Sequence, residues 1–201
     1  MSIRVAVLGP HGSGKSTLVR RVMSLYERRQ RLPGGVGELP NGYLLSRTVG
    51  TADVVDERRL IVLGNYETTG RDHHGMKMFD RYHSNFLQAL RYANTQKDPV
   101  LCEGGFLKPR RLAGMIGAAF SSSLVVVWIE DPLSRSRWRK DTGSVSFEKN
   151  KNLQLETIDV MCDYGAQFYV VNTPDEGLDV VCGLIDTSLD TAHAKPDNLR
   201  L

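Results

Sequence analysis

A glycine-rich segment near the N-terminus constrains the fold of this chain more than any other feature. The apolar run from Ile3 to Leu8 before it is typical of a buried parallel strand, and residues from about Ser16 to Arg28 after it favour a helix. The segment fits the pattern G-x-x-x-x-G-K-[ST] and consists of Gly9, Pro10, His11, Gly12, Ser13, Gly14, Lys15, Ser16 and Thr17. A strand, a glycine-rich loop and a helix in this order predict a phosphate-binding loop in a parallel α/β sheet.

The residue types of this segment suit a triphosphate and a metal ion. Glycines at positions 9, 12 and 14 leave space for backbone N–H groups to point at phosphate oxygens, and they permit unusual φ angles. We expect Lys15 to reach the β- and γ-phosphates and the Ser16 hydroxyl to ligate magnesium. We expect His11 to fill a loop position rather than to act as a base. We therefore expect residues 9–17 as a whole to bind ATP together with Mg²⁺.

The remainder of the chain alternates between strand-like and helix-like segments. Strands are expected at 43–48, 52–55, 59–63, 100–102, 124–129 and 168–171, the first three as a hairpin, and helices at 78–92, 109–120, 147–164 and 174–189. This alternation predicts a three-layer α/β/α fold with a mostly parallel central sheet. With 201 residues, 41% of them hydrophobic, the chain can bury one core. We expect one domain over residues 1–190, a lid-like segment at about 132–146 and a flexible tail at 191–201.

The sequence shows no feature of a secreted or membrane protein. The first apolar run is too short for a signal peptide, and no stretch is long enough to span a membrane. Cys102, Cys162 and Cys182 lack metal-like spacing and are expected to be reduced core thiols, with Cys162 in the apolar stripe of the helix at 147–164. These features favour a cytoplasmic location.

A carboxylate is expected at the end of a core strand beside the phosphate loop. Glu103 follows the apolar residues 100–102 and precedes two glycines, which allow a sharp turn and close approach of a ligand. It could hold magnesium through water, or act as general base on an acceptor hydroxyl. Glu130 and Asp131 follow the next strand and compete for this role. However, Asp131 before Pro132 is more typical of a helix N-cap.

Two arginines are candidates for stabilising charge during phosphoryl transfer. Arg135 and Arg139 lie four residues apart and would share one face of a short helix. Such a pair can clamp phosphates, and the flexible residues 141–144 after it suit a closing lid. The alternative is a solvated surface helix.

These features together resemble the P-loop kinases of nucleosides and nucleotides. The resemblance covers most of the chain and rests on the phosphate loop, the strand end at Glu103, the arginine-bearing segment and residues 172–174. In that family the loop after the last strand often lines the adenine pocket. The resemblance therefore implies that Asn172, Thr173 and Pro174 lie on the adenine side.

The segment 64–72 resembles a narrower group of bacteriophage P-loop kinases. These enzymes phosphorylate the hydroxymethyl group of 5-hydroxymethyluracil within DNA, and their pattern is Gly-x-Tyr followed by Gly-x-Asp. Arg71 stands here where the related pattern has a second glycine. The resemblance implies that Tyr66, Arg71 and Asp72 face the acceptor, with Tyr66 stacking on a flipped base and Asp72 accepting the hydroxyl proton. A phage-encoded chain would act in the host cytoplasm.

Three functions remain open from the sequence. The first is the DNA-base kinase. The second is a kinase for a free deoxynucleoside monophosphate, a nucleoside or another small metabolite. The third is a P-loop NTPase that acts on a partner, although no guanine-reading N-K-x-D motif is present. Scattered arginine pairs could follow a DNA backbone, but the net charge of +3 is modest for a DNA enzyme. A homodimer is left open, and no membrane partner is expected.

Overall fold

The fold is built on one twisted sheet, seen in a computed structural model that describes residues 2–10, 12–32, 42–51, 54–64, 66, 95–103, 123–134 and 146–193. Seven strands are hydrogen-bonded in the order β2 (Arg28–Arg31), β3 (Gly42–Thr51), β4 (Val54–Leu63), β5 (Val100–Glu103), β1 (Arg4–Leu8), β6 (Leu124–Ile129) and β7 (Gln167–Val171). The five strands from β4 to β7 in this order run parallel, and β2 and β3 extend the sheet antiparallel.

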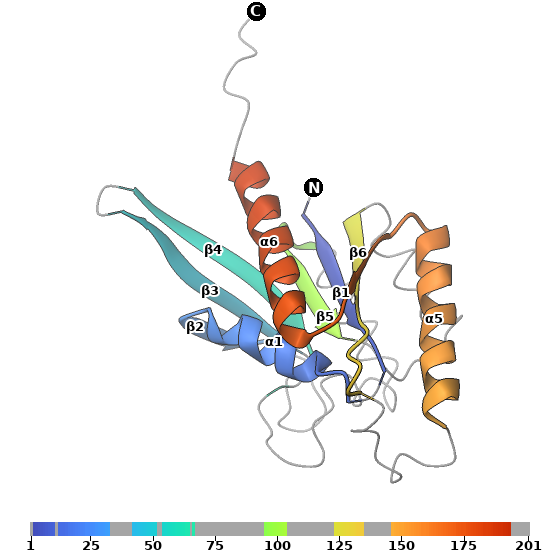
Figure 1. Ribbon diagram of the computed structural model, residues 1–201. Helices are drawn as coiled ribbons and strands as arrows, with labels where there is room; N and C mark the ends of the chain where they lie inside the picture. Colours follow the sequence, from blue (N-terminus) through green and yellow to red (C-terminus); the bar gives the residue numbers. More distant parts are fainter. Residues whose placement is uncertain are drawn as a thin grey trace, which may run out of the picture.

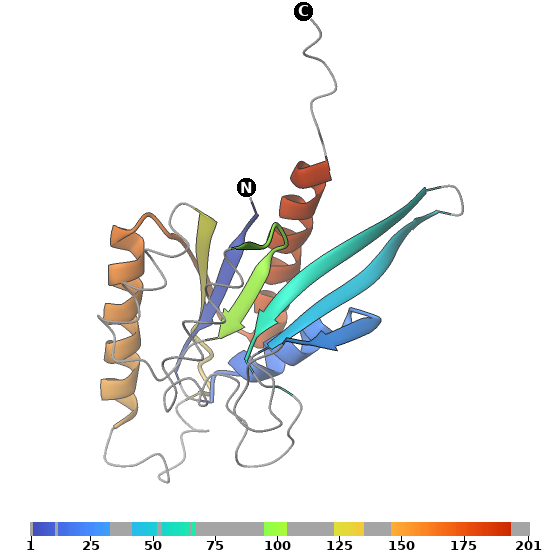
Figure 2. The same cartoon turned by 180° about the vertical axis from the view of Figure 1, so that it is seen from behind.

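Helices cover both faces of this sheet. On one face α1 (Lys15–Ser24) and α6 (Pro174–His193) pack side chains such as Leu18 and Ile185 against the strands. On the other face α5 (Phe147–Asp163) packs Ile158 and Met161. Figure 1 shows α1 and α6 in front of the sheet, and in Figure 2, which is seen from the opposite side, they lie behind it. Every residue of β1, β5 and β6 is buried, as expected for strands covered on both faces. The predicted three-layer α/β/α fold with a mostly parallel sheet is confirmed.

The sheet topology brings three strand ends together around the phosphate loop. Strand β1 is central, with β5 on one side and β6 on the other. Val7 is in register with Glu103, and Leu8 is in register with Trp128. In open α/β sheets, ligands bind outside the carboxyl ends of the strands where neighbouring connections diverge. The loop after Leu8 occupies this position.

The first helix is shorter than predicted. It ends at Ser24 instead of continuing to about Arg28, and residues 28–31 form strand β2. Two contacts explain the difference: Tyr26 packs into the core, and β2 pairs antiparallel with residues 43–46 of β3. Tertiary pairing therefore overrides the helix propensity of this arginine-rich segment.

The hairpin and the last two helices also differ from the prediction in detail. The hairpin is confirmed, but it consists of two ten-residue strands that project from the body of the molecule (Figure 1). Helix α6 continues to His193 rather than ending near residue 189, so residues 191–193 are helical and do not belong to the predicted tail. The buried residues of α5 are Gln154, Thr157, Ile158 and Met161. The buried stripe is thus shifted from the predicted one, and Cys162 is exposed instead of lying in the core.

Several predicted elements lie outside the described residues. These are the helices at 78–92 and 109–120, the lid-like residues 135–145 and the tail at 194–201. Within the described parts of the chain, no helix is both long and apolar enough to cross a membrane.

Candidate phosphate- and metal-binding site

Positive φ angles and close backbone contacts account for the glycines of the phosphate loop. Gly12 and Gly14 have φ angles of 85° and 90°, which favour glycine. A Cβ atom at Gly14 would lie 2.5 Å from Cγ of Pro174, and one at Gly9 would lie 2.7 Å from the carbonyl oxygen of Ile129. The loop therefore admits no side chain at these two positions.

The loop has the properties of an anion site. Helix α1 begins directly after Gly14, whose lack of a side chain leaves the first N–H groups of the helix without a side-chain cap. Among the described residues, the buried hydroxyl of Ser13 has no hydrogen-bond partner. A buried polar group of this kind normally bonds to something, so the loop fits a phosphate group.

Lys15 lies across the loop. Its Nζ donates hydrogen bonds of 2.8 Å to the carbonyl oxygens of Gly9 and Pro10. Burial lowers the pKa of Lys15 to about 8, and the opposing charge of Glu103 partly offsets this effect. Because burial disfavours the charged form of Lys15, the negative charge of a nearby triphosphate would stabilise its ammonium group.

Ser16 and Glu103 form the strongest candidate for a metal site. The Ser16 hydroxyl donates a 2.8 Å hydrogen bond to Oε1 of Glu103, whose residue is only 4% exposed. Hydroxyl and carboxylate oxygens are ligands that Mg²⁺ prefers, together with water and phosphate. The two side chains that the sequence assigned to magnesium are therefore adjacent, and their chemistry fits that ion.

The two competing carboxylates are engaged elsewhere. Glu130 forms an ion pair with Lys151 of α5. Oδ1 of Asp131 accepts a 2.8 Å hydrogen bond from the backbone N–H of Leu133. This is the side-chain contact expected of an N-cap, and it closes the turn after β6. The helix that the Asp-Pro pair predicted lies outside the described residues.

Gln154 of α5 contacts the phosphate loop and was not predicted from the sequence. Its Oε1 accepts a 3.1 Å hydrogen bond from the backbone N–H of Gly9, and its Nε2 donates to Oδ1 of Asn150 at 2.8 Å. The residue is 6% exposed. Its position four residues before Ile158 was the available signal, because it places a polar side chain on the buried face of an amphipathic helix.

The structure corrects the stacking role predicted for Tyr66. The residue is 4% exposed and belongs to the core cluster on the α1 side of the sheet. Its N–H donates to the Tyr43 hydroxyl at 3.1 Å, and the Arg20 guanidinium lies 5.9 Å from its ring centroid. Burial, and then the charge of Glu103, raises the pKa of Tyr66 well above its usual range. Tyr66 is therefore buried in contact with Tyr43 and Arg20 and has no open ring face for a base.

Residues 172–174 begin helix α6 next to the phosphate loop. Oγ1 of Thr173 accepts a 3.1 Å hydrogen bond from the N–H of Glu176, and the Glu176 carboxylate accepts one of 2.7 Å from the N–H of Asn172. This reciprocal arrangement is a variant of the capping box, for which Thr-x-x-Glu is the sequence signal. Pro174 reaches Gly14. The adenine-side role of the three residues stays a prediction.

His11, Arg71, Asp72, Arg135 and Arg139 lie outside the described residues, so their roles also remain predictions. A separate hollow of about 510 Å³ lies between α6 and the starts of β6 and β7, lined by Val125, Gln167 and Tyr169 among others. It opens at the amino ends of the strands, away from the phosphate loop.

Comparison with known proteins gives a likeness to solved structures. No protein-family model matches the chain, and no curated protein matches it. Among solved structures, the chain is similar to the crystal structure of shikimate kinase from Aquifex aeolicus. The TM-score is 0.41 and the sequence identity is 15%, over 96% of this chain and 99% of that chain.

Proposed function

We propose that this chain is an ATP- and magnesium-dependent kinase. The observation that carries the proposal is the 2.8 Å contact between the Ser16 hydroxyl and the Glu103 carboxylate, beside Lys15 on a glycine loop. Three types of group that phosphoryl transfer requires meet here: backbone N–H donors, a cation, and oxygen ligands for a metal ion.

Each residue has a distinct role in this proposal. The loop N–H groups and Lys15 bind and orient the triphosphate, and Lys15 offsets charge on its terminal phosphates. Ser16 and Glu103 would hold magnesium, which supplies charge neutralisation and fixes the geometry of the phosphates. Arg135 and Arg139 would add positive charge from the lid-like segment.

We propose 5-hydroxymethyluracil in DNA as the acceptor, phosphorylated on its hydroxymethyl group. The support is the segment 64–72, which begins beside the site: Tyr66 lies within the electrostatic reach of Glu103. Asp72 would accept the proton of the primary hydroxyl, and Arg71 would face the acceptor. Such an acceptor in duplex DNA must be flipped out of the stack.

A free nucleoside, deoxynucleoside monophosphate or other small metabolite is the second candidate acceptor. The burial of Tyr66 favours it, because a small acceptor needs no exposed aromatic platform. Hydrolysis on behalf of a protein partner is the third, less favoured, function.

A transfer assay with γ-labelled ATP and magnesium tests these functions. The acceptors are DNA containing 5-hydroxymethyluracil, matched thymine DNA, and a panel of free nucleosides and monophosphates. We expect label only in the modified DNA, its loss in Lys15→Ala, and a larger effect of Asp72→Asn on transfer than on ATP binding.

Other outcomes separate the alternatives. Label in a free nucleotide would replace the DNA acceptor with a small one, and release of phosphate alone would indicate an NTPase. Full activity of Lys15→Ala would refute the kinase mechanism itself. An effect of Asp72→Asn on ATP binding alone would refute its acceptor-side role.

A further inference from the structure

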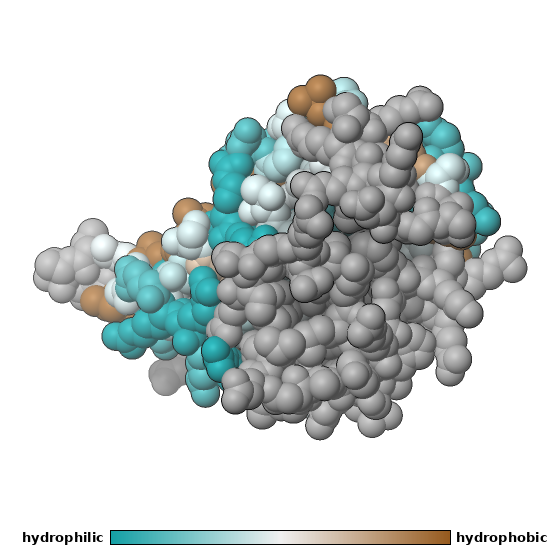
Figure 3. Space-filling model, turned by 90° about the horizontal axis from the view of Figure 1, so that it is seen from below, coloured by the Kyte–Doolittle hydropathy of each residue, from teal (hydrophilic) through white to brown (hydrophobic). Residues whose placement is uncertain are grey.

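Strand β2 places a dense group of arginines at one edge of the sheet. Its four residues are Arg28, Arg29, Gln30 and Arg31, and all four are exposed. Since side chains alternate along a strand, Arg28 lies on one face and Arg29 and Arg31 on the other. Seen from below, the described residues on the side of the molecule where the β2–β4 extension lies are largely hydrophilic (Figure 3).

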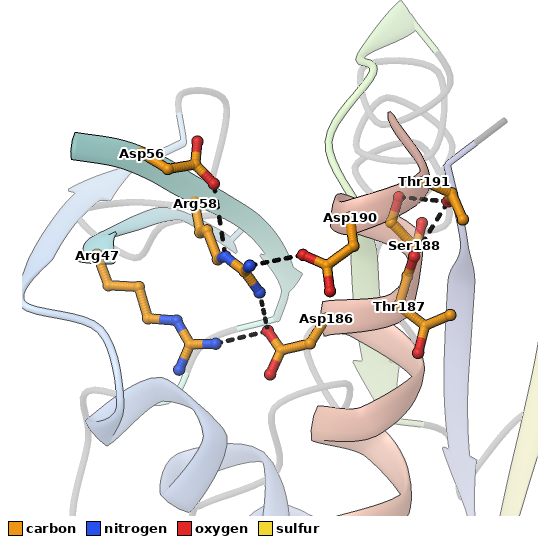
Figure 4. Close-up of polar contacts among 8 residues, drawn as sticks. All are labelled: Arg47, Asp56, Arg58, Asp186, Thr187, Ser188, Asp190 and Thr191. Carbon is orange, nitrogen blue, oxygen red and sulfur yellow. Dashed lines mark hydrogen bonds and ion pairs between the residues drawn. The ribbon is translucent and has the colours of Figure 1, made fainter. Parts of the chain in front are cut away.

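The arginines of the neighbouring strands β3 and β4 differ from those of β2 because they form ion pairs with carboxylates. Arg47 and Arg58 are bound to Asp186 and Asp190 of α6 (Figure 4), and Arg59 pairs with Asp98.

In contrast, neither Arg28 nor Arg29 forms an ion pair within the described residues. The Arg29 guanidinium lies 5.5 Å from the ring centroid of Tyr43, a contact that orients it and leaves N–H groups for an anion. The acid next to them in the chain is the exposed Glu27. Arg28 and Arg29 therefore give this sheet edge positive charge that no described carboxylate pairs with.

The distance between strand β2 and strand β1, which leads into the phosphate loop, matches a short stretch of duplex DNA. Strand β2 is four strands from β1, which corresponds to about 19 Å at about 4.8 Å per strand. It runs towards the same edge of the sheet as the carboxyl ends of β4 and β5, because Arg31 is in register with Tyr43 and Tyr43 with Val62. A separation of about 19 Å is spanned by about six base pairs at 3.4 Å each.

We propose that the β2 edge binds the phosphate backbone of duplex DNA while a base of the same duplex occupies the catalytic site. Guanidinium groups suit this partner because they bind phosphate oxygens through paired N–H donors. This inference rests on the proposed function, because that function makes duplex DNA the substrate. It adds a second contact, which holds the duplex at a point away from the reacting base.

The test measures binding of a fluorescent thymine-containing duplex by anisotropy, without ATP, over a range of salt concentrations. Each lost phosphate contact lowers the slope of log affinity against log salt concentration by about 0.9. We expect a loss of about 0.9 for Arg28→Gln and about 1.8 for the double variant Arg28→Gln/Arg29→Gln, with several-fold weaker binding. The matched control is Lys97→Gln, an exposed cation just before β5, which should bind like the wild type.

Thermal unfolding of each variant excludes a folding defect. The exposed Arg28 side chain forms no ion pair within the described residues, so Arg28→Gln keeps the test valid if Arg29→Gln destabilises the protein. An unchanged slope in the double variant, an equal loss in Lys97→Gln, or no duplex binding by the wild type at low salt would overturn the inference.

A kinase assay then separates this inference from the proposed function. We expect the double variant to raise KM for modified DNA several-fold while leaving KM for ATP unchanged. Duplex binding that depends on β2 without any phosphorylation of modified DNA would refute only the acceptor. Phosphorylation of modified DNA with unaltered KM in the double variant would refute only the role of β2.

Discussion

Ser16 and Glu103 are 87 residues apart in the sequence and 2.8 Å apart in space. Parallel strands explain this proximity, because β1 and β5 end at the same edge of the sheet and the residues after each strand meet there. The residues that matter for chemistry are therefore determined by strand order as much as by motif. Glu130, which follows the strand β6 on the other side of β1, therefore serves as a matched control for Glu103.

Replacing Glu103 by glutamine should lower kcat by about 10²–10⁴-fold, because a neutral amide is a poor magnesium ligand and a poor base. The matched control is Glu130→Gln, at the end of β6, where the carboxylate pairs with Lys151 on the surface. We expect kcat of this control to stay within about twofold of the wild type. Steady-state kinetics over a magnesium titration measures both, and a strongly impaired control with an active Glu103→Gln variant would reverse the assignment.

Lys15 makes the affinity for ATP depend on pH. Its pKa is lowered to about 8 in the free protein, and a bound triphosphate would raise it, so binding takes up a proton near and above pH 8. Affinity should therefore be constant well below pH 8 and fall above it, approaching about tenfold per pH unit.

Calorimetry in two buffers of different ionisation enthalpy measures this proton uptake directly. Lys15→Arg, whose side chain stays charged, should lose the dependence. A wild-type affinity that is flat from about pH 7 to about pH 9.5 would contradict the role of Lys15.

At the scale of elements, α5 acts on the phosphate loop through one side chain. Gln154→Ala would leave the buried N–H of Gly9 without its partner, which costs about 1–3 kcal/mol. If the loop holds ATP, part of this loss should appear as a higher KM for ATP, with a smaller change in kcat. Asn150→Ala, which removes only the partner of the Gln154 amide group, is the graded control and should have a weaker effect. Equal effects of the two variants would show that the contact with Gly9 is unimportant.

Ion pairs between arginines of the β3–β4 hairpin and aspartates of α6 connect these two elements. Arg58, with its side chain 16% exposed, contacts both Asp186 and Asp190, and Asp186 also binds Arg47 (Figure 4). Because this network is partly buried, we expect Arg58→Met to lower the free energy of unfolding by about 1–2 kcal/mol. Arg21→Met removes a more exposed pair with Asp175 and should cost less than about 1 kcal/mol. Urea denaturation measures both, and equal losses would contradict a special role for the network.

At the scale of the whole molecule, local patterns predicted the parallel core better than the extension beside it. The motif at residues 9–17 and the apolar runs of β1, β5 and β6 each carry enough signal to place a strand. Strand β2 was missed because its four polar residues have no apolar pattern and exist as a strand only through pairing with β3. The capping role of Thr173 was available in the sequence, whereas the burial of Tyr66 depends on Tyr43 and Arg20. Contacts of this long-range kind leave no local signature.

The phosphate loop also links elements from both layers of helices, and this predicts how a ligand acts on stability. Gly9 contacts α5 through Gln154, Gly14 contacts α6 through Pro174, and Ser16 contacts β5 through Glu103. A triphosphate bound only to the folded loop stabilises the whole molecule by about 2.7 kcal/mol at about one hundred times its Kd. For a chain of this size, that corresponds to a rise in Tm of about 5–11 °C.

Differential scanning calorimetry with ATP and magnesium, against magnesium alone, measures this shift. Lys15→Ala should lose most of it, whereas Glu130→Gln should retain it, since Glu130 pairs with Lys151 away from Ser16 and Glu103. A wild-type Tm that does not move at millimolar ATP and magnesium would mean that the loop does not hold the triphosphate. A shift that survives in Lys15→Ala would place the nucleotide somewhere other than this loop.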